Sequence, residues 1–140
     1  MKNSLKIVAF YNNLEKVYSP NNINILDPYS DKEVQKIYKK FYCKYFHDTR
    51  RRVIIFGINP GRFGGGITGI PFTDPHNLTK KCKIKNDFDQ KKELSSTFIY
   101  EMIDKFGGPK NFYNKFLISS ICPYGLSLIH ISEPTRRKHI

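Results

Sequence analysis

The chain changes character at residue 57, where four consecutive apolar residues give way to a stretch dense in glycine. The apolar run is Val53-Ile54-Ile55-Phe56, and residues 57–77 contain six of the nine glycines. A short, continuous apolar run bounded by charges and glycine is typical of a strand that is buried on both faces. The glycine-rich stretch predicts a long loop that leaves the carboxyl end of this strand.

A second apolar run, residues 116–121, closes on Cys122-Pro123 and predicts a second strand. Ser30 and Glu33 form the S-x-x-E pattern of a helix capping box. Alternating helices and apolar strands predict an α/β fold, a three-layer α/β/α arrangement in which residues 53–57 and 116–121 are neighbouring parallel strands. Ligands bind such sheets at the carboxyl ends of their strands. Apolar residues at helical spacing predict helices near 4–18, 31–47 and 90–106.

Two phosphate-binding motifs fail to fit the glycine stretch. A P-loop requires a lysine after its second glycine, and Ile67 stands in that place. Gly64, Gly66 and Gly69 match G-x-G-x-x-G, but the dinucleotide fingerprint must turn directly from a strand into a helix. Two prolines follow within six residues and argue against a helix there. The sequence therefore gives no support for a nucleotide cofactor, and no cofactor or metal is expected.

A flat ligand suits the loop better. Asn59 places an amide just beyond the strand, on a turn made by Pro60 and Gly61. Glycine lets the backbone approach a ligand closely and direct N–H groups toward it. Phe72 follows a flexible stretch and is free to stack on that ligand. An amide, backbone donors and an aromatic ring together predict a site for a nucleobase flipped out of DNA.

The segment from Gly57 to Phe72 resembles the corresponding loop of the single-strand-selective monofunctional uracil-DNA glycosylases. Their run is Gly-Met-Asn-Pro-Gly-Pro-Phe-Gly, then three residues, then Thr-Gly-Val-Pro-Phe. The two align without a gap and differ mainly at Arg62, Gly65 and Ile67. A bacterial branch of the family is more similar still, and the resemblance covers about residues 5–125. Its motifs match, in order, Glu93-Leu94-Ser95-Ser96, Gly107-Gly108, Phe112-Tyr113 and Ser119-Ser120-Ile121-Cys122-Pro123.

The resemblance implies that Asn59 is catalytic and positions the attacking water. A neutral amide suits the reaction, because an acid there would hold the water more strongly but would repel the departing base anion. Taken alone, without the matched segment around it, an Asn before Pro is more typical of a simple turn than of a catalytic site.

The resemblance also implies how the base is bound. Phe72 corresponds to the aromatic residue that stacks on uracil. Ser120 stands where eukaryotic members have an Asn that reads the edge of uracil, and a serine cannot bond donor and acceptor in one plane. His76 lies just past the loop, where a solvated histidine is the expectation. Backbone groups around the base are expected from Ile58, Gly61 and Phe63.

The charge of the chain predicts a polyanionic partner. Lysine and arginine number 24 against 12 acidic residues, a formal net charge of +12. We expect DNA as the partner, single-stranded or mismatched and containing uracil, bound by a monomer. Codon bias toward lysine would give the same charge. A basic α/β domain that binds nucleic acid without chemistry is the alternative function.

The cysteines predict a reducing compartment. There are three, Cys43, Cys82 and Cys122, widely spaced and with no CxxC pair, so neither a disulfide framework nor a zinc site is indicated. No apolar run approaches the ~20 residues of a membrane helix. The N-terminus has no signal-peptide pattern. The expected location is the cytoplasm.

Residues 126–140 are predicted to be a non-native, poorly packed tail. Glycosylases of the family that this chain resembles carry a second catalytic segment, His-Pro-Ser-Pro. Residues 130–136 follow Gly125 too closely to correspond to that segment. Residues 126–136 resemble the in-frame translation of a common transposase sequencing adaptor, although a genuine basic tail is the alternative. The domain is then expected to comprise residues 1–125, to lack its C-terminal part and to be inactive in this form.

Overall fold

A computed structural model describes residues 1–128 of the chain. Within that range no helix has the length and apolar character that crossing a membrane requires. The elements, in chain order, are α1 (Asn3–Asn12), β1 (Ile23–Leu26), the 3-10 helix η1 (Pro28–Ser30), α2 (Lys32–Tyr45), β2 (Val53–Gly57), α3 (Gly65–Thr68), α4 (Pro75–Lys80), α5 (Leu94–Lys105), α6 (Pro109–Lys115), β3 (Phe116–Ser120) and β4 (Gly125–Leu128).

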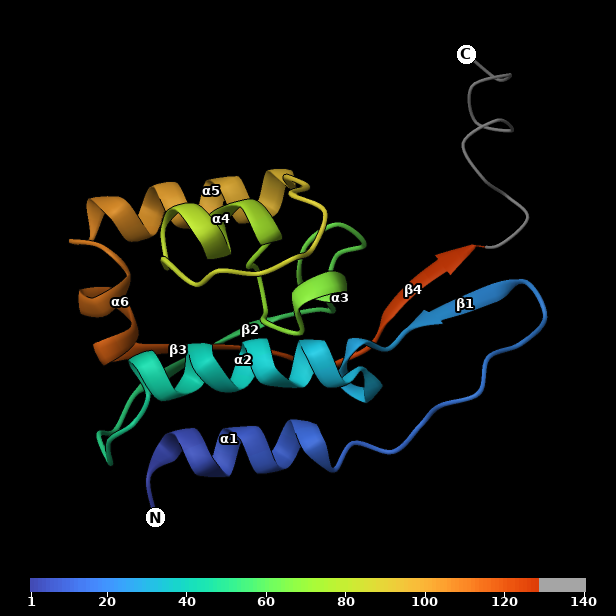
Figure 1. Ribbon diagram of the computed structural model, residues 1–140, viewed down its shortest axis with the longest axis horizontal. Coiled ribbons are helices and arrows are strands. Elements are labelled where there is room, and N and C mark those ends of the chain that lie inside the picture. Colours follow the sequence, from blue (N-terminus) through green and yellow to red (C-terminus); the bar gives the residue numbers. More distant parts are fainter. Residues whose placement is uncertain (129–140) are drawn as a thin grey trace.

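The two predicted strands form a parallel pair, which confirms the expected α/β class. β2 and β3 pair in register from Val53 opposite Phe116 to Gly57 opposite Ser120. In Figure 1 the pair runs behind α2, with α4 and α5 above it and α1 below it. Both strands therefore direct their carboxyl ends to the same edge of the sheet.

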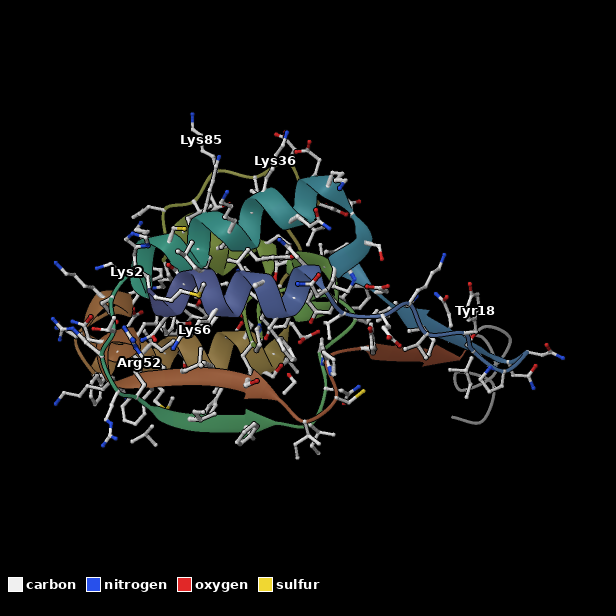
Figure 2. All side chains as sticks on the ribbon, turned by 90° about the horizontal axis from the view of Figure 1, so that it is seen from below. Lys2, Lys6, Tyr18, Lys36, Arg52 and Lys85 are labelled. Carbon is white, nitrogen blue, oxygen red and sulfur yellow. The ribbon has the colours of Figure 1, made fainter. Side chains whose placement is uncertain are left out.

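The expectation that the first strand is buried on both faces is wrong. Val53 and Phe56 are each 62% exposed, and Ile54 is 49% exposed. Among the described residues β2 pairs only with β3, and Figure 2 shows it as the outer strand of the pair. Within residues 1–128 no strand pairs with the other edge of β2, which leaves backbone groups unpaired there, and the faces of this apolar strand are only partly covered.

The first two helices differ from expectation at their ends. α1 stops at Asn12 rather than near residue 18, and the Asn13 side chain donates a hydrogen bond to the Ala9 carbonyl at its C-terminus. The capping residue of α2 is Asp31 rather than Ser30. The Asp31 carboxylate accepts from the backbone N–H of Glu33 at 2.8 Å, whereas the Ser30 hydroxyl donates to Asp27. An aspartate one residue closer to the helix thus takes the capping role.

The expected long loop after β2 contains helical turns. α3 forms inside the glycine stretch, and α4 begins at Pro75, where a missing N–H is tolerated because first-turn donors have no helical partner. Asp74 caps α4 by accepting from the Asn77 N–H at 2.7 Å. Pro75 therefore starts a helix instead of preventing one, and Pro71 lies in the turn before it. A further helix, α6, begins with Pro109 in the same way.

The apolar residues at helical spacing that predicted a helix near 90–106, among them Leu94, Phe98 and Ile103, lie on different faces of α5. Ile103 is fully buried, but Leu94 is 90% and Phe98 66% exposed. Tyr100 was not among those apolar residues, but it is fully buried. Its hydroxyl forms a hydrogen bond with the Tyr113 hydroxyl at 2.8 Å. A tyrosine fills the core here because its hydroxyl finds partners inside it.

A second ladder involves part of the predicted tail. β1 and β4 pair antiparallel, from Ile23 opposite Leu128 to Leu26 opposite Gly125, and neither strand was expected. The backbone of residues 126–128 is therefore in a strand. Residues 129–140, with the rejected motif at His130, lie outside the described part of the chain.

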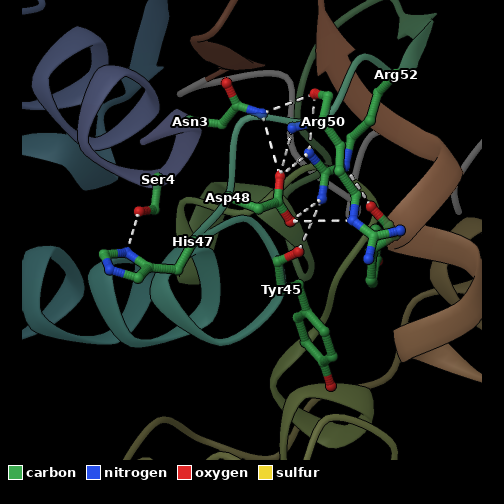
Figure 3. Close-up of polar contacts among 8 residues, drawn as sticks. Asn3, Ser4, Tyr45, His47, Asp48, Arg50 and Arg52 are labelled. Carbon is green, nitrogen blue, oxygen red and sulfur yellow. Dashed lines mark hydrogen bonds and ion pairs between the residues drawn. The ribbon is translucent and has the colours of Figure 1, made fainter. Parts of the chain in front are cut away.

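An ion pair fixes the entry to β2 (Figure 3). Both terminal nitrogens of Arg52 donate to the Asp48 carboxylate, at 2.8 Å each. The same guanidinium donates to the Tyr45 carbonyl at 3.1 Å and lies 4.5 Å from the centre of the Phe46 ring. The hydrogen bonds from Arg52 lower the pKa of Asp48 from 3.8 to about 2. Arg52, the residue directly before β2, is thereby bonded to the C-terminal end of α2.

Candidate active site

A small pocket lies at the carboxyl ends of the two parallel strands. Its volume is about 80 Å³. Four segments contribute its walls: the turn after β2, the loop before α4, the start of α5, and the end of β3. The lining residues are Asn59, Pro60, Gly61, Phe72, Glu93, Ser95 and Ser120.

Asn59 and Ser120 are brought together by an extension of the parallel ladder. The Ile121 N–H donates to the Gly57 carbonyl at 2.9 Å, and the Cys122 N–H donates to the Ile58 carbonyl at 2.9 Å. These bonds tie the segment after β3 to the segment after β2. The amide and the hydroxyl therefore stand on neighbouring strand ends, where parallel sheets place ligand-binding groups.

Phe72 lines the pocket with its ring packed on Gly57 and its own backbone in a strained conformation. Its ring lies so close to Gly57 that a methyl group there would overlap it. Its φ is 54°, in the left-handed region, which costs a non-glycine residue roughly 1–2 kcal/mol. Strain of this kind persists where the surrounding structure holds the residue in place, and it is frequent at functional sites. The ring is partly buried and has one side in the pocket.

The glycine loop is closed by its own backbone. The N–H groups of Gly64 and Gly66 donate to the Gly61 carbonyl at 3.2 and 2.8 Å. A methyl group at Gly66 would lie only 2.6 Å from that oxygen, so glycine is required for this close turn. Gly69 ends α3 with a φ of 74°, also in the left-handed region. The loop is thus a compact turn with a fixed shape.

Glu93 is a pocket residue that the sequence did not single out. It immediately precedes α5, but its side chain makes no capping bond to that helix. Its carboxylate accepts from the Phe63 N–H at 3.0 Å and from the Ser95 hydroxyl at 3.0 Å. Two features of the sequence could have identified Glu93 as a pocket residue. It belongs to one of the matched motifs, and it is an acidic residue directly before a helix.

The remaining expected site residues lie outside the pocket wall. Ile58 is 78% exposed, and its carbonyl is used by Cys122. Phe63 is 42% exposed, and its N–H is bonded to Glu93. His76 lies in the first turn of α4 and does not line the pocket. The structure therefore gathers Asn59, Gly61, Phe72 and Ser120 from the expected set.

Two cations lie beside Phe63 of the glycine loop. The guanidinium of Arg62 is 5.3 Å from the centre of the Phe63 ring, and the ammonium of Lys91 is 5.7 Å from it. Both groups carry positive charge next to the glycine loop, and the partly exposed Phe63 ring beside them is an aromatic surface. This combination suits the backbone and bases of a nucleic-acid strand.

The pocket carries neutral hydrogen-bonding groups and one bonded carboxylate. Within residues 1–128 no group of three or more His, Cys, Asp or Glu side chains is arranged to hold a metal ion. An amide and a hydroxyl beside an aromatic ring are suited to orienting water and a flat heterocycle.

Comparison with known proteins gives a consistent result. A family model described as the uracil DNA glycosylase superfamily matches residues 43–140, more than half of the chain. The crystal structure of wild-type Pedobacter heparinus SMUG2 is similar, with a TM-score of 0.86 and 44% sequence identity. That match covers 92% of this chain and 56% of the P. heparinus protein, so the chain spans little more than half its length. Comparison with curated proteins gives no match.

Proposed function

The chain belongs to the uracil-DNA glycosylase superfamily, and from that premise we propose that it forms the water-positioning and base-stacking half of a monofunctional DNA glycosylase. Its substrate is uracil or a related damaged base, and its reaction is hydrolysis of the N-glycosidic bond. The observation that carries the proposal is the meeting of Asn59, Phe72 and Ser120 in one pocket at the carboxyl ends of β2 and β3.

The reaction begins with extrusion of the base from the DNA stack, which costs least in single strands and at mismatches. The base enters beside Phe72, and Ser120 bonds one atom of its edge. The Asn59 amide oxygen accepts a hydrogen bond from a water molecule below the sugar. As the bond between base and sugar breaks, its electron pair leaves with the base, and the water adds to the sugar carbon and releases a proton to solvent.

The charges of the chain support DNA as the partner. The net charge is +12, and Arg62 and Lys91 lie against the Phe63 ring in and beside the glycine loop. The proposal includes a monomer acting on single-stranded or mismatched DNA. A cytoplasmic location is supported by three cysteines that are free thiols.

We also propose that the 140-residue chain alone does not release uracil. The chain spans 56% of the P. heparinus protein. Among the described residues β2 has one unpaired edge, and its apolar side chains are largely exposed. The test compares the chain with a chimera that adds the portion of the P. heparinus protein that it does not cover. Both are assayed for abasic sites in uracil-containing single strands, and the chimera alone is expected to be active. No release by a folded chimera would count against the glycosylase function, whereas strong release by the chain would refute only its inactivity.

A further proposal concerns residues 126–140, which we take to be foreign to the domain. It rests on the adaptor resemblance, while β4 includes residues 126–128 and the family match extends to residue 140. Sequencing the locus from DNA prepared without adaptors tests the proposal. Recovery of the same codons would refute it.

Binding of DNA by the chain should fall steeply with salt. Lysine and arginine release counterions from phosphates, so each contact adds roughly 0.7–0.9 to the slope of log affinity against log salt. Fluorescence anisotropy of a labelled single strand between low and high salt measures this slope. Replacing both Arg62 and Lys91 with Gln should reduce it by about 1–2, since two contacts are removed. An affinity independent of salt would argue against the DNA assignment.

Phe72→Ala in the chimera should weaken uracil processing roughly ten- to a hundredfold, mainly through substrate binding. Stacking of a base on an aromatic ring contributes roughly 1–3 kcal/mol. The matched control is Phe98→Ala, because Phe98 is 66% exposed on α5 and does not line the pocket. Single-turnover rates at several substrate concentrations separate binding from chemistry. A loss confined to the rate at saturation would show that Phe72 has another role.

A further inference from the structure

We propose that Glu93 is a positioning residue, which joins the water-holding turn to the base-stacking loop and so sets the distance between Asn59 and the bound base. The inference rests on the proposed function and extends it to a residue with no assigned role. The carboxylate lines the same pocket as Asn59 and Phe72.

The first half of the link is the side chain of Glu93. One carboxylate oxygen accepts from the Phe63 N–H at 3.0 Å and the other accepts from the Ser95 hydroxyl at 3.0 Å. Both oxygens are therefore held, and the bond to Phe63 crosses thirty positions of the chain. A carboxylate suits this place because it offers two acceptors and no donor.

The glycine loop is shaped to receive this carboxylate. A methyl group at Gly61 would overlap both carboxylate oxygens, and one at Gly64 would come within 2.8 Å of Oε1. The missing side chains leave the space that the carboxylate fills. Gly61 is two residues from Asn59, so a shift of the carboxylate would be transmitted directly to the turn that carries the amide.

The second half of the link is the backbone of Glu93. Its N–H donates to Asp74 Oδ2 at 2.8 Å, while Asp74 Oδ1 caps α4. The Asp74 N–H donates to the Ser96 hydroxyl at 3.1 Å, and both Asp74 and Ser96 are fully buried. Asp74 lies two residues after Phe72. The buried network thus fixes the Phe72 loop to the residue whose side chain holds the glycine loop.

The two halves predict a specific effect on the reaction. Removing the carboxylate breaks its hydrogen bond with the Phe63 N–H in the glycine loop. The hydrogen bond from the Glu93 N–H to Asp74, and with it the position of Phe72, should stay unchanged. Base binding should persist, while alignment of the water deteriorates. Misplacement of a reacting group by about 1 Å costs on the order of a hundredfold in rate.

The experiment measures uracil release by the chimera carrying Glu93→Ala, Glu93→Gln or the control Glu101→Ala, Glu101 being exposed on α5. We expect Glu93→Ala to lower kcat about ten- to a hundredfold with little change in KM. Glu93→Gln should recover part of that loss, since it keeps one acceptor, and Glu101→Ala should behave as the unsubstituted chimera. An unchanged kcat for Glu93→Ala would overturn the proposal, as would a loss expressed only in KM.

A double substitution tests the contact itself. Gly61→Ala should displace the carboxylate and reduce kcat, whereas in the Glu93→Ala background the added methyl group should cause little further loss. Additive losses would show that the two residues act independently and would refute the link.

Hydrogen exchange separates failure of this inference from failure of the proposed function. Exchange of the Phe63 amide in the 140-residue chain needs no catalysis, and it should become faster in Glu93→Ala. A chimera that releases no uracil refutes the function while this exchange still reports the link. Unchanged exchange at Phe63 refutes the link even if the enzyme is active.

Discussion

Asn59→Ala in the chimera is expected to reduce the rate of uracil release roughly 10²- to 10³-fold while leaving substrate affinity within a few-fold. The amide acts on a water molecule that matters only as positive charge develops on the sugar. An interaction made only in the transition state appears in kcat and in kcat/KM alike, not in binding. Asn59 is exposed at the pocket rim, so its truncation removes little packing.

Two further variants make the Asn59 measurement decisive. Asn22→Ala changes an exposed asparagine in the segment between α1 and β1 and should leave the rate unchanged. Asn59→Asp should hold the water but repel the departing base anion, and its rate should lie between those of the alanine variant and the unsubstituted protein. Full activity of Asn59→Ala would assign the water to another residue. A loss seen only in affinity would make Asn59 a binding group.

Arg52→Ala is expected to lower the free energy of unfolding of the chain by about 3–5 kcal/mol, a large part of the roughly 5–15 kcal/mol typical of a domain. The Arg52 side chain is only 4% exposed, and its loss leaves the carbonyls of Tyr45 and Tyr113 without this donor. Asp48 loses its bidentate partner and keeps the hydrogen bonds from the Arg50 N–H and the Asn3 amide. Removing one partner of a buried ion pair is strongly destabilising because the groups left behind lose their compensation. Urea denaturation measures the change. The control is Arg51→Ala, whose side chain is exposed and whose effect should stay within about 0.5 kcal/mol.

The acid dependence of stability provides a second readout of the same ion pair. The folded pKa of Asp48 is lowered from 3.8 to about 2, first of all by the hydrogen bonds from Arg52. The ionised carboxylate therefore stabilises the fold above about pH 4, and this contribution is lost as pH falls toward 2. In Arg52→Ala the same fall in pH should remove less stability. Equal acid sensitivity in both proteins would show that the pair is not responsible.

The sequence predicted the elements that depend on local pattern. Continuous apolar runs are sufficient to identify β2 and β3, and parallel pairing follows from the helices that separate them. The position of Asn59 beside Phe72 also follows from local chemistry, since glycines allow the chain to turn tightly between them. These features need no knowledge of distant partners.

Features that depend on distant partners were missed. The exposure of Val53 and Phe56 depends on what lies beside β2, which an apolar run does not reveal. The β1–β4 ladder joins segments a hundred residues apart and has weak local signals. Glu93 lines the pocket with its backbone bonded to Asp74 and its carboxylate bonded to Phe63, and neither spacing nor composition predicts those long-range bonds.

The backbone of Phe72 has a consequence for attempts to stabilise the fold by substitution. A residue with φ of 54° is strained unless it is glycine, or to a lesser degree asparagine or aspartate, so the aromatic ring is present at a cost to folding. Glycine at position 72 would relieve that strain, but it would also remove the partly buried ring that packs on Gly57 and against the core. Backbone strain and side-chain packing therefore oppose each other at this one position.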